Sequence, residues 1–295
     1  MPKTSSRASD SGISSTCGGA AADASTSNPG APAPCCPLPG DPGPAVSLPG
    51  LRPRGGTSSG PARAPRIRSR IGVGAAGGFY PAPHRYELYL SQGCPRSLRL
   101  SVTLRLLGLQ DSVATTVLGD PAATPGAFTA LRRAYEATWH HYEGPLTAPT
   151  LCDRWSGRVV SNHTPDILRD LAGLPGGSDA AHVTTLRPAA LAADIDALSR
   201  LLDRDVTPAA SADVLCAALE PLDRRLAAHP YVLGRRLTAA DVDLWAALTQ
   251  AGPAGVLADT LALHPRLDAY ARRLGGHPAF WGARCQLTPR SRHDG

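Results

Sequence analysis

Lysine is almost absent from this sequence of 295 residues. The thirty basic side chains include a single lysine, Lys3, and the other 29 are arginines. These arginines are scattered along the chain and often stand beside acidic residues, as in "LLDRD" and "PLDRR". The formal net charge of +6 is therefore better explained by a solvated surface than by a phosphate-binding face, and nucleic-acid binding is not expected.

Cysteines at the spacing of a redox or zinc motif are absent as well. No two of the seven cysteines form a C-x-x-C motif, and histidines at zinc-ligand spacing are missing. A disulfide scaffold and a bound metal are therefore not expected, and a reducing cytosol fits this cysteine usage best. The seven cysteines are Cys17, Cys35, Cys36, Cys94, Cys152, Cys216 and Cys285.

The sequence also lacks an apolar run that approaches the length of a membrane helix. Its start, "MPKTSSRASD", is not followed by the apolar region of a secretory signal. An organellar transit peptide would fit the serines and arginines of the first segment, but Asp10, Asp23 and Asp41 count against it. The sequence therefore predicts a cytoplasmic protein with no membrane partner.

Residues 1–78 are dominated by serine, glycine, alanine and proline and show no apolar periodicity. Burial could not offset the entropy cost of ordering such a segment. We therefore expect a disordered tail, whose arginine-rich end "RAPRIRSR" is solvated. Cys35 and Cys36 lie in this tail, and the sequence assigns them no role.

Residues 79–172 carry alternating strand and helix patterns. The order β-α-β-α-β-β-α predicts a thioredoxin-like domain. In its last helix, Thr164 is the expected N-cap and Pro165 the expected first residue. The predicted strands cover residues 85–91, 111–119, 148–153 and 158–162, and the predicted helices cover residues 95–109, 126–142 and 164–174.

Strand patterns vanish after the linker-like residues 173–187. Residues 188–287 predict an all-helical domain, and residues 288–295 a flexible tail. The expected fold class is therefore α+β, with a thioredoxin-like domain followed by a helical domain. The predicted helices of the second domain cover residues 189–202, 210–228, 238–251 and 267–274.

Cys94 stands where the first strand of this pattern gives way to a helix. With Pro95 at the first helical position, Cys94 would be the N-cap, facing free N–H groups at the positive end of the helix dipole. Such placement can lower a cysteine pKa from about 8.5 to between about 3.5 and 7.5. Arg96 and Arg99 would add positive charge, and Ser97 could donate a hydrogen bond to the thiolate. The alternative is a small apolar cysteine that fills a junction.

Two further segments could bind a thiol-bearing peptide. A cis-proline at Pro149 would expose the backbone of Ala148 for antiparallel pairing with such a ligand, whereas a trans-proline would be an ordinary strand start. His163 and Thr164 open a helix whose N–H groups could hold a carboxylate such as that of a γ-glutamyl group. Plain helix capping is the alternative for this pair.

These segments together resemble the glutathione S-transferases, most closely the xi class, the glutathionyl-hydroquinone reductases. The resemblance covers about residues 78–287 and rests on "RYELYLSQGCPRSLR" and "LTAPTLCDRWSGRVVSN". A third support is "YVLGRRLTAADVDLWAAL", in which Thr238 and Asp241 resemble the capping box of the family's helical domain. That box is a folding signal and carries no information on substrate.

The resemblance implies a reaction and roles for single residues. Cys94 would be the nucleophile that takes glutathione from a glutathionyl adduct of a hydroquinone. The backbone of Ala148, before Pro149, would hold the cysteinyl part of glutathione, and His163 and Thr164 would bind the γ-glutamyl part. A second glutathione would then release glutathione disulfide. Glutathione is the implied co-substrate, an aromatic or quinone-like molecule the acceptor, and a homodimer a possible assembly.

Three functions remain open from the sequence. The family's tryptophan two residues after the cysteine is Arg96 here, and its acidic residue and serine are His163 and Thr164. A catalytically relaxed ligand carrier or protein-interaction module, with Cys94 kept for packing, is therefore an alternative to the enzyme. A third possibility keeps the chemistry but uses a different low-molecular-weight thiol.

Overall fold

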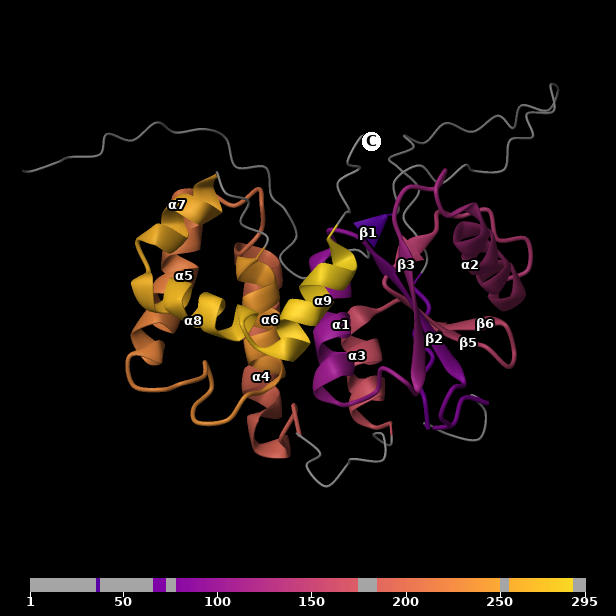
Figure 1. Ribbon diagram of the computed structural model, residues 1–295, viewed down its shortest axis with the longest axis horizontal. Coiled ribbons are helices and arrows are strands. Elements are labelled where there is room, and N and C mark those ends of the chain that lie inside the picture. Colours follow the sequence, from indigo (N-terminus) through magenta and orange to yellow (C-terminus); the bar gives the residue numbers. More distant parts are fainter. Residues whose placement is uncertain (1–35, 38–65, 73–77, 175–184, 250–254, 289–295) are drawn as a thin grey trace, which may run out of the picture. The chain divides into compact units, whose positions relative to one another are not determined.

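The computed structural model describes residues 36–37, 66–72, 78–174, 185–249 and 255–288. In this part of the chain, strands and helices are interspersed as far as residue 161, and the later elements are all helical (Figure 1). The fold is the one that the sequence predicts, a thioredoxin-like domain followed by a helical domain.

The described residues contain six short strands, all of them before residue 162. They are β1 (Cys36–Pro37), β2 (Tyr86–Ser91), β3 (Val113–Leu118), β4 (Thr147–Ala148), β5 (Thr150–Asp153) and β6 (Arg158–Ser161). Four of them form a mixed sheet in the order β3-β2-β5-β6, in which β2 is parallel to β3 and antiparallel to β5. β1 and β4 form a separate antiparallel pair.

Three helices cover the two faces of the four-stranded sheet. They are α1 (Pro95–Leu106), α2 (Pro125–Thr138) and α3 (Thr164–Ala172). Leu88 and Leu90 of β2 are buried in one cluster with residues of α1 and α3, whereas Tyr89 between them is buried with residues of α2. Successive side chains of a strand point to opposite faces, so α1 and α3 lie on one face and α2 on the other (Figure 1).

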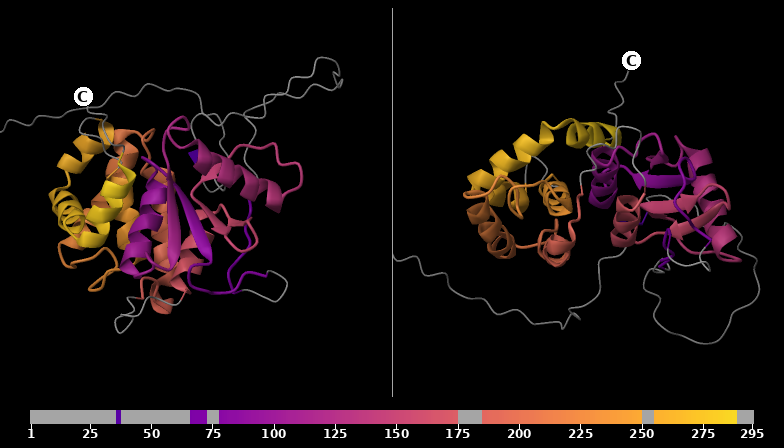
Figure 2. Two further views of the ribbon diagram at one scale, coloured as in Figure 1. Left: turned by 45° about the vertical axis from the view of Figure 1, so that its right-hand side comes forward. Right: turned by 90° about the horizontal axis from the view of Figure 1, so that it is seen from below.

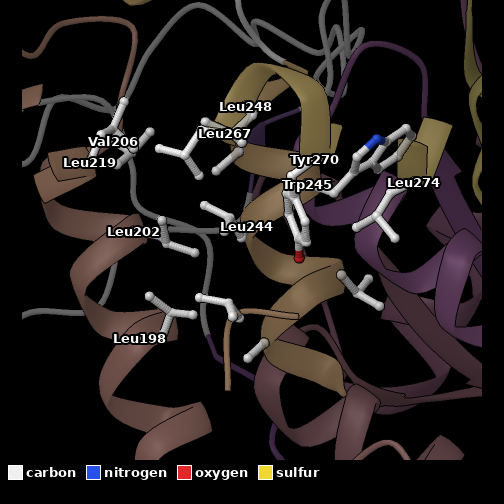
Figure 3. Close-up of a cluster of buried hydrophobic side chains, with 14 of the residues drawn as sticks. Leu198, Leu202, Val206, Leu219, Leu244, Trp245, Leu248, Leu267, Tyr270 and Leu274 are labelled. Atoms are coloured by element: carbon white, nitrogen blue, oxygen red, sulfur yellow. The ribbon is translucent and has the colours of Figure 1, made fainter. Parts of the chain in front are cut away.

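The second half of the described chain is built of helices around a central one. They are η2 (Ala189–Leu191, a 3-10 turn), α4 (Ala192–Asp205), α5 (Ala212–Leu226), α6 (Ala239–Leu248), α7 (Val256–Ala262), α8 (Pro265–Gly275) and α9 (Pro278–Leu287). Every residue from Ala240 to Leu248 is buried, as expected of a helix that is apolar on all sides. Figure 3 shows Leu244 and Trp245 of α6 among leucines of α4 and residues of α8.

Helix α1 packs on the helical half of the chain as well as on the sheet. Its neighbours there are α6 and α9, which lie beside it in Figures 1 and 2. The Ser101 hydroxyl donates to Gln286 Oε1 at 2.8 Å, and the Gly93 N–H donates to the Leu287 carbonyl at 3.2 Å. The start of α1 is therefore fixed from two sides.

Residues 66–72 differ from the expectation of a disordered tail through residue 78. Ile67 and Ile71 are buried, and the N–H of Ile67 donates to Asn162 Oδ1 at 2.9 Å. Ion pairs fasten the segment to α3, namely Arg68–Asp166 at 2.7 Å and Arg70–Asp170 at 2.6 Å. The arginines of "RAPRIRSR" thus include two that bind buried carboxylates, which composition alone does not reveal. Most of the predicted tail, residues 1–35 and 38–65, lies outside the described residues.

The start of α3 is a second correction. His163, with extended backbone, is the N-cap, and Thr164 is the first helical residue, one position later than expected. Pro165 still lies in the first turn, where its missing N–H costs nothing. The helices α7 and α9 were not predicted, because neither segment has an extended apolar period.

The described residues contain neither a helix long and apolar enough to cross a membrane nor a cluster of three potential metal ligands. No disulfide joins Cys94, Cys152, Cys216 and Cys285 to one another.

Candidate functional site

Cys94 lies at the junction of β2 and α1. Its extended backbone, with φ −89° and ψ 119°, makes it the N-cap, and Pro95 is the first residue of the helix. Its carbonyl accepts from the Leu98 N–H at 3.0 Å, which starts the helical pattern. The side chain makes no capping hydrogen bond to the helix, and 6% of the residue is exposed. A negative charge on the sulfur would therefore be stabilised by the field of the helix N-terminus rather than by a cap hydrogen bond.

Ser97 connects the first turn of α1 to the end of β2. Its fully buried hydroxyl oxygen accepts the Ser91 N–H at 2.9 Å. The loop between Ser91 and Ser97 contains Cys94, so this hydrogen bond helps to fix where the sulfur stands. A hydrogen bond from Ser97 to the Cys94 thiolate stays a prediction.

Arg99 is almost fully buried between the two halves of the chain. Its Nη2 lies 3.0 Å from Asp203 Oδ1 of α4, and its Nε lies 3.5 Å from Asp243 Oδ1 of α6. Burial opposes its charge, but Asp243, Asp203 and the nearby Cys94 favour it, and the pKa of Arg99 is raised. The positive charge of Arg99, which the sequence analysis expected to support the Cys94 thiolate, is therefore paired with two carboxylates as well.

A cavity of about 210 Å³ opens at Cys94. It is bounded by the start of α1, by Thr249 after α6, and by the end of α9, where Arg284 contributes a cation and Leu287 an apolar wall. Such a volume holds many waters or part of an organic molecule. The sequence did not point to Thr249 or Arg284, since both come from the helical half and only the tertiary fold brings them to Cys94.

A second cavity, of about 70 Å³, lies among α1, α3 and α4. Four residues singled out from the sequence line it together, namely Arg96, Arg99, His163 and Thr164. The hydroxyls of Thr164 and Thr103, both in its lining, are buried and have no hydrogen-bond partner among the described residues. Buried hydroxyls normally have partners, so this cavity is suited to a polar ligand. Thr103 was not singled out, because a threonine inside a helix gives no signal of its own.

His163 and Asp166 set the charge at the start of α3. The His163 Nδ1 lies 3.0 Å from Asp166 Oδ2, and Asp166 also pairs with Arg68 and Arg169. Burial lowers the pKa of His163, with Arg68 acting in the same direction and Asp166 against it. The pKa of Asp166 is lowered as well, because its hydrogen bond from Arg68 and the nearby positive charges outweigh the effect of burial. At neutral pH this end of the helix carries a neutral histidine and an ionised, already paired carboxylate.

Ala148 and Pro149 lie apart from both cavity linings. Their peptide bond is cis, as the sequence suggested. Ala148 is fully buried, and its strand β4 pairs with β1, with Cys36 opposite Ala148 and Pro37 opposite Thr147. The Thr147 hydroxyl lies 2.7 Å from the Tyr135 hydroxyl of α2. This contact holds β4 against α2.

Thr238 and Asp241 form the predicted capping box of α6. The Asp241 carboxylate is fully buried and accepts four hydrogen bonds. They come from the Val232 N–H, the Thr238 N–H, the Thr238 hydroxyl and the Tyr270 hydroxyl, at 2.9, 2.8, 3.0 and 2.6 Å. The box is structural and lies in neither cavity.

The predicted site residues therefore fall into three groups. Cys94 lines one cavity, whereas Arg96, Arg99, His163 and Thr164 line another that shares no lining residue with the first. The backbone of Ala148 belongs to a strand pair. Chemically, the arrangement offers a thiol at a helix N-terminus beside a cavity with a cation, and buried hydroxyls in a second, polar cavity.

The helical half matches a known domain family. Residues 187–273 match the model described as glutathione S-transferase, C-terminal domain. Two curated relatives are similar to a longer stretch. Glutathionyl-hydroquinone reductase YqjG from Escherichia coli (strain K12) is 28% identical over 62% of this chain and 64% of its own length. Glutathionyl-hydroquinone reductase PcpF from Sphingobium chlorophenolicum is 26% identical over 66% of this chain and 71% of its own length. The chain thus spans less than two thirds of the first relative.

Solved structures show the same architecture. The crystal structure of the glutathione S-transferase Xi from Phanerochaete chrysosporium is 25% identical, with a TM-score of 0.62. The match covers 76% of this chain and 83% of that protein. The likeness includes the strand-bearing half, which the family model does not match.

Proposed function

We propose that this chain, whose helical half matches the glutathione S-transferase C-terminal domain, is a glutathione-dependent thiol transferase or reductase whose nucleophile is Cys94. Its substrates would be glutathionyl adducts of aromatic, quinone-like molecules, as the names of its reductase relatives suggest. One observation carries the proposal: Cys94 stands at the N-cap of α1 and lines a cavity of about 210 Å³.

The proposed reaction has two steps. The Cys94 thiolate attacks the sulfur of the adduct, so that a sulfur–sulfur bond forms and the carbon–sulfur bond breaks. The electron pair of that bond stays on the ring carbon, which takes up a proton to give the free hydroquinone. A second glutathione thiolate then attacks the glutathione sulfur of the mixed disulfide. Glutathione disulfide leaves, and the Cys94 thiolate is restored.

In this proposal, the groups around Cys94 have different roles. The α1 N-terminus stabilises the thiolate, and Ser97 positions its loop. The apolar and cationic walls at Leu287 and Arg284 would receive the acceptor. A ring in this cavity would have its sulfur close to Cys94. A reducing compartment such as the cytosol would supply the thiol.

Glutathione itself would lie along the first turn of α1 and the start of α3. The Thr164 hydroxyl, which has no hydrogen-bond partner among the described residues, and the Arg96 guanidinium are suited to carboxylates. The edge of β4 at Ala148 is suited to the backbone of the cysteinyl residue. Since the pKa of His163 is lowered by burial, His163 would act as a neutral hydrogen-bonding group.

A matched pair of cysteine variants tests the proposal. Turnover of glutathionyl-menadiol should be lost in Cys94→Ser and kept in Cys285→Ser, because Cys285 is exposed on α9 and outside the cavity lining. Iodoacetamide should label Cys94 at neutral pH faster than a free cysteine, whereas Cys285 serves as the exposed reference in the same sample. Turnover that survives in Cys94→Ser would contradict the assignment of the nucleophile.

The alternative is a ligand carrier that keeps the fold without the chemistry. The low exposure of Cys94 and the lack of a cap hydrogen bond to its sulfur favour it. Slow labelling of Cys94, together with no Cys94-dependent turnover of any thiol adduct, would select this function. Turnover with another cellular thiol but not with glutathione would keep the chemistry and change the co-substrate.

A further inference from the structure

The segment of residues 66–72 lies outside both predicted domains, yet it is hydrogen-bonded to the junction between β6 and α3. The Ile67 N–H donates to Asn162 Oδ1 at 2.9 Å, and the Asn162 N–H donates to the Ile67 carbonyl at 3.1 Å. Arg68 forms an antiparallel bridge with Ser161, the last residue of β6. These contacts hold the two residues that precede the N-cap of α3.

The side chain of Arg68 also contacts the first turn of α3. Its Nε donates to Asp166 Oδ2 at 2.7 Å, and its Nη2 donates to Oδ1 of the same carboxylate at 3.1 Å. That carboxylate is buried, and His163 Nδ1 and Arg169 Nη1 lie 3.0 and 3.2 Å from its oxygens. Arg68 therefore binds both oxygens of a buried carboxylate at the start of a helix.

This pairing decides which negative charge can use the positive end of α3. A carboxylate in the first turn of a helix is itself stabilised by the helix dipole, and an ionised Asp166 would repel a ligand anion at the same end. Although burial opposes ionisation, the hydrogen bond from Arg68 lowers the pKa of Asp166, so the carboxylate is ionised and paired at neutral pH. Because Arg68 offsets its charge, the start of α3 stays available to a ligand.

The start of α3 belongs to the lining of the second cavity. Thr164, the first helical residue, lines this cavity, and its hydroxyl is buried and has no hydrogen-bond partner among the described residues. Arg96 of α1 lines the same cavity. A buried hydroxyl without a partner at a helix N-terminus points to a polar ligand, and in the proposed function that ligand is the γ-glutamyl carboxylate of glutathione.

We propose that Arg68 is a positioning residue of the thiol-binding site, which keeps the start of α3 open to the γ-glutamyl carboxylate by pairing with Asp166. This inference rests on the proposed function for the identity of the ligand. Arg68 is not part of the cavity lining, so it acts through Asp166 and not by contact with the thiol. A residue that precedes the first strand of the four-stranded sheet thus determines how tightly the second cavity binds its ligand.

A cycle of two proteins and two ligands tests the positioning role. The ligands are S-methylglutathione and its analogue without the α-carboxylate of the γ-glutamyl residue, and isothermal titration calorimetry measures the Kd of each. In Arg68→Gln the Kd of S-methylglutathione should rise about fivefold or more, because the charge of Asp166 then acts against the ligand carboxylate. The Kd of the analogue should not change. An equal rise for both ligands would overturn the inference, since Arg68 would then only support the fold.

Two further variants make the test independent of stability. Arg70→Gln breaks the matched pair Arg70–Asp170, which joins the same segment to the same helix at 2.6 Å. Asp170 lies outside the cavity lining, so both Kd values should stay those of the parent protein. The double variant Arg68→Gln/Asp166→Asn removes both charges, and its Kd for S-methylglutathione should return toward that of the parent. A Kd that stays as high as in Arg68→Gln would overturn the inference.

Turnover separates this inference from the proposed function. A protein that binds S-methylglutathione with the expected dependence on Arg68, but shows no Cys94-dependent turnover of glutathione adducts, would overturn the proposed function and keep the inference. A protein that turns over such adducts, but has the same Kd for S-methylglutathione with and without Arg68 or binds neither ligand, would overturn the inference and keep the proposed function.

Discussion

At the scale of single residues, His163 shows how burial and charge compete at the second cavity. Burial is the largest influence on its pKa and lowers it, although Asp166 lies 3.0 Å away. The histidine is therefore neutral in the folded protein at a pH where the unfolded chain already binds a proton. As the pH falls below the ordinary histidine pKa of about 6.5, the unfolded state takes up more protons than the folded state.

This difference predicts a pH-dependent contribution of His163 to stability. The contribution is present above the unfolded pKa and is lost as the pH falls toward the lowered folded pKa. Urea unfolding at about pH 7.5 and about pH 5.5 should therefore show a smaller loss of stability on acidification for His163→Gln than for the parent protein. The exposed His229, replaced in the same way, is the matched control. An equal loss in all three proteins would contradict the expected sign.

Single residues also show what the sequence could and could not predict. Cys94 was placed at the helix N-cap because a strand pattern, a Cys-Pro pair and a helical pattern follow one another within a few residues. The pairing of Arg68 with Asp166 could not be read in the same way, since 98 positions separate the two residues. The arginine-rich segment looked solvated because its carboxylate partners lie on α3. Only tertiary contacts reveal such pairs.

At the scale of elements, the capping box of α6 is the most sharply defined local signal. The Asp241 carboxylate closes the helix N-terminus through Thr238 and also binds the Tyr270 hydroxyl of α8. The Thr-x-x-Asp spacing made the box visible in the sequence. The hydrogen bond to Tyr270 was not visible, because Tyr270 lies on another helix, 29 positions after Asp241.

Replacement of Asp241 by alanine should therefore cost more than the loss of an ordinary cap. A lost cap costs about 1 kcal/mol, and each buried donor left without a partner adds about 1–3 kcal/mol, so we expect a loss of at least about 2 kcal/mol. Asp268→Ala is the control, since that carboxylate is half-exposed and pairs with Arg272 on the surface of α8. This substitution should lower the free energy of unfolding by less than about 1 kcal/mol. Chemical unfolding measures both. A similar cost for the two variants would mean that the box contributes no more than a surface pair.

Helix boundaries followed from the sequence where caps and apolar periods agreed, and failed where they did not. α6 begins at Ala239, one residue after the start of the predicted range, and Thr238 caps it as the capping-box motif predicted. α9 was missed because its segment is short and its hydrophobic residues follow no clear period. Its role is to close the Cys94 cavity with Arg284 and Leu287. A helix that is stabilised mainly by packing on another domain need not show a clear apolar period in its own sequence.

At the scale of the whole chain, Arg99 connects the thioredoxin-like half with the helical half. It lies on α1, and its two carboxylate partners lie on α4 and α6. The sequence shows that Arg99 is close to Cys94 along the chain. It could not show the two carboxylate partners, which follow Arg99 by more than 100 positions. The same guanidinium could thus hold the two halves together, support the thiolate, or do both.

Two variants separate these roles of Arg99. Arg99→Met leaves Asp243 buried without its cation, which should cost about 3–5 kcal/mol. Arg204→Met removes an exposed arginine that pairs with Asp205 and should change stability far less than Arg99→Met does. In the double variant Arg99→Met/Asp243→Leu the buried carboxylate is removed as well, and only the partly exposed Asp203 loses its partner, so much of the stability should return.

The double variant is informative for the chemistry because its fold should be restored while the cation is missing. If Arg99 supports the Cys94 thiolate, iodoacetamide labelling of Cys94 at neutral pH should be slower in the double variant than in the parent protein, although the unfolding midpoints are similar. Labelling of the exposed Cys285 should be equal in the two proteins, which controls for reagent and accessibility. Unchanged labelling of Cys94 would assign Arg99 to the connection between the halves alone, and the helix N-terminus would then remain as the source of thiolate stabilisation.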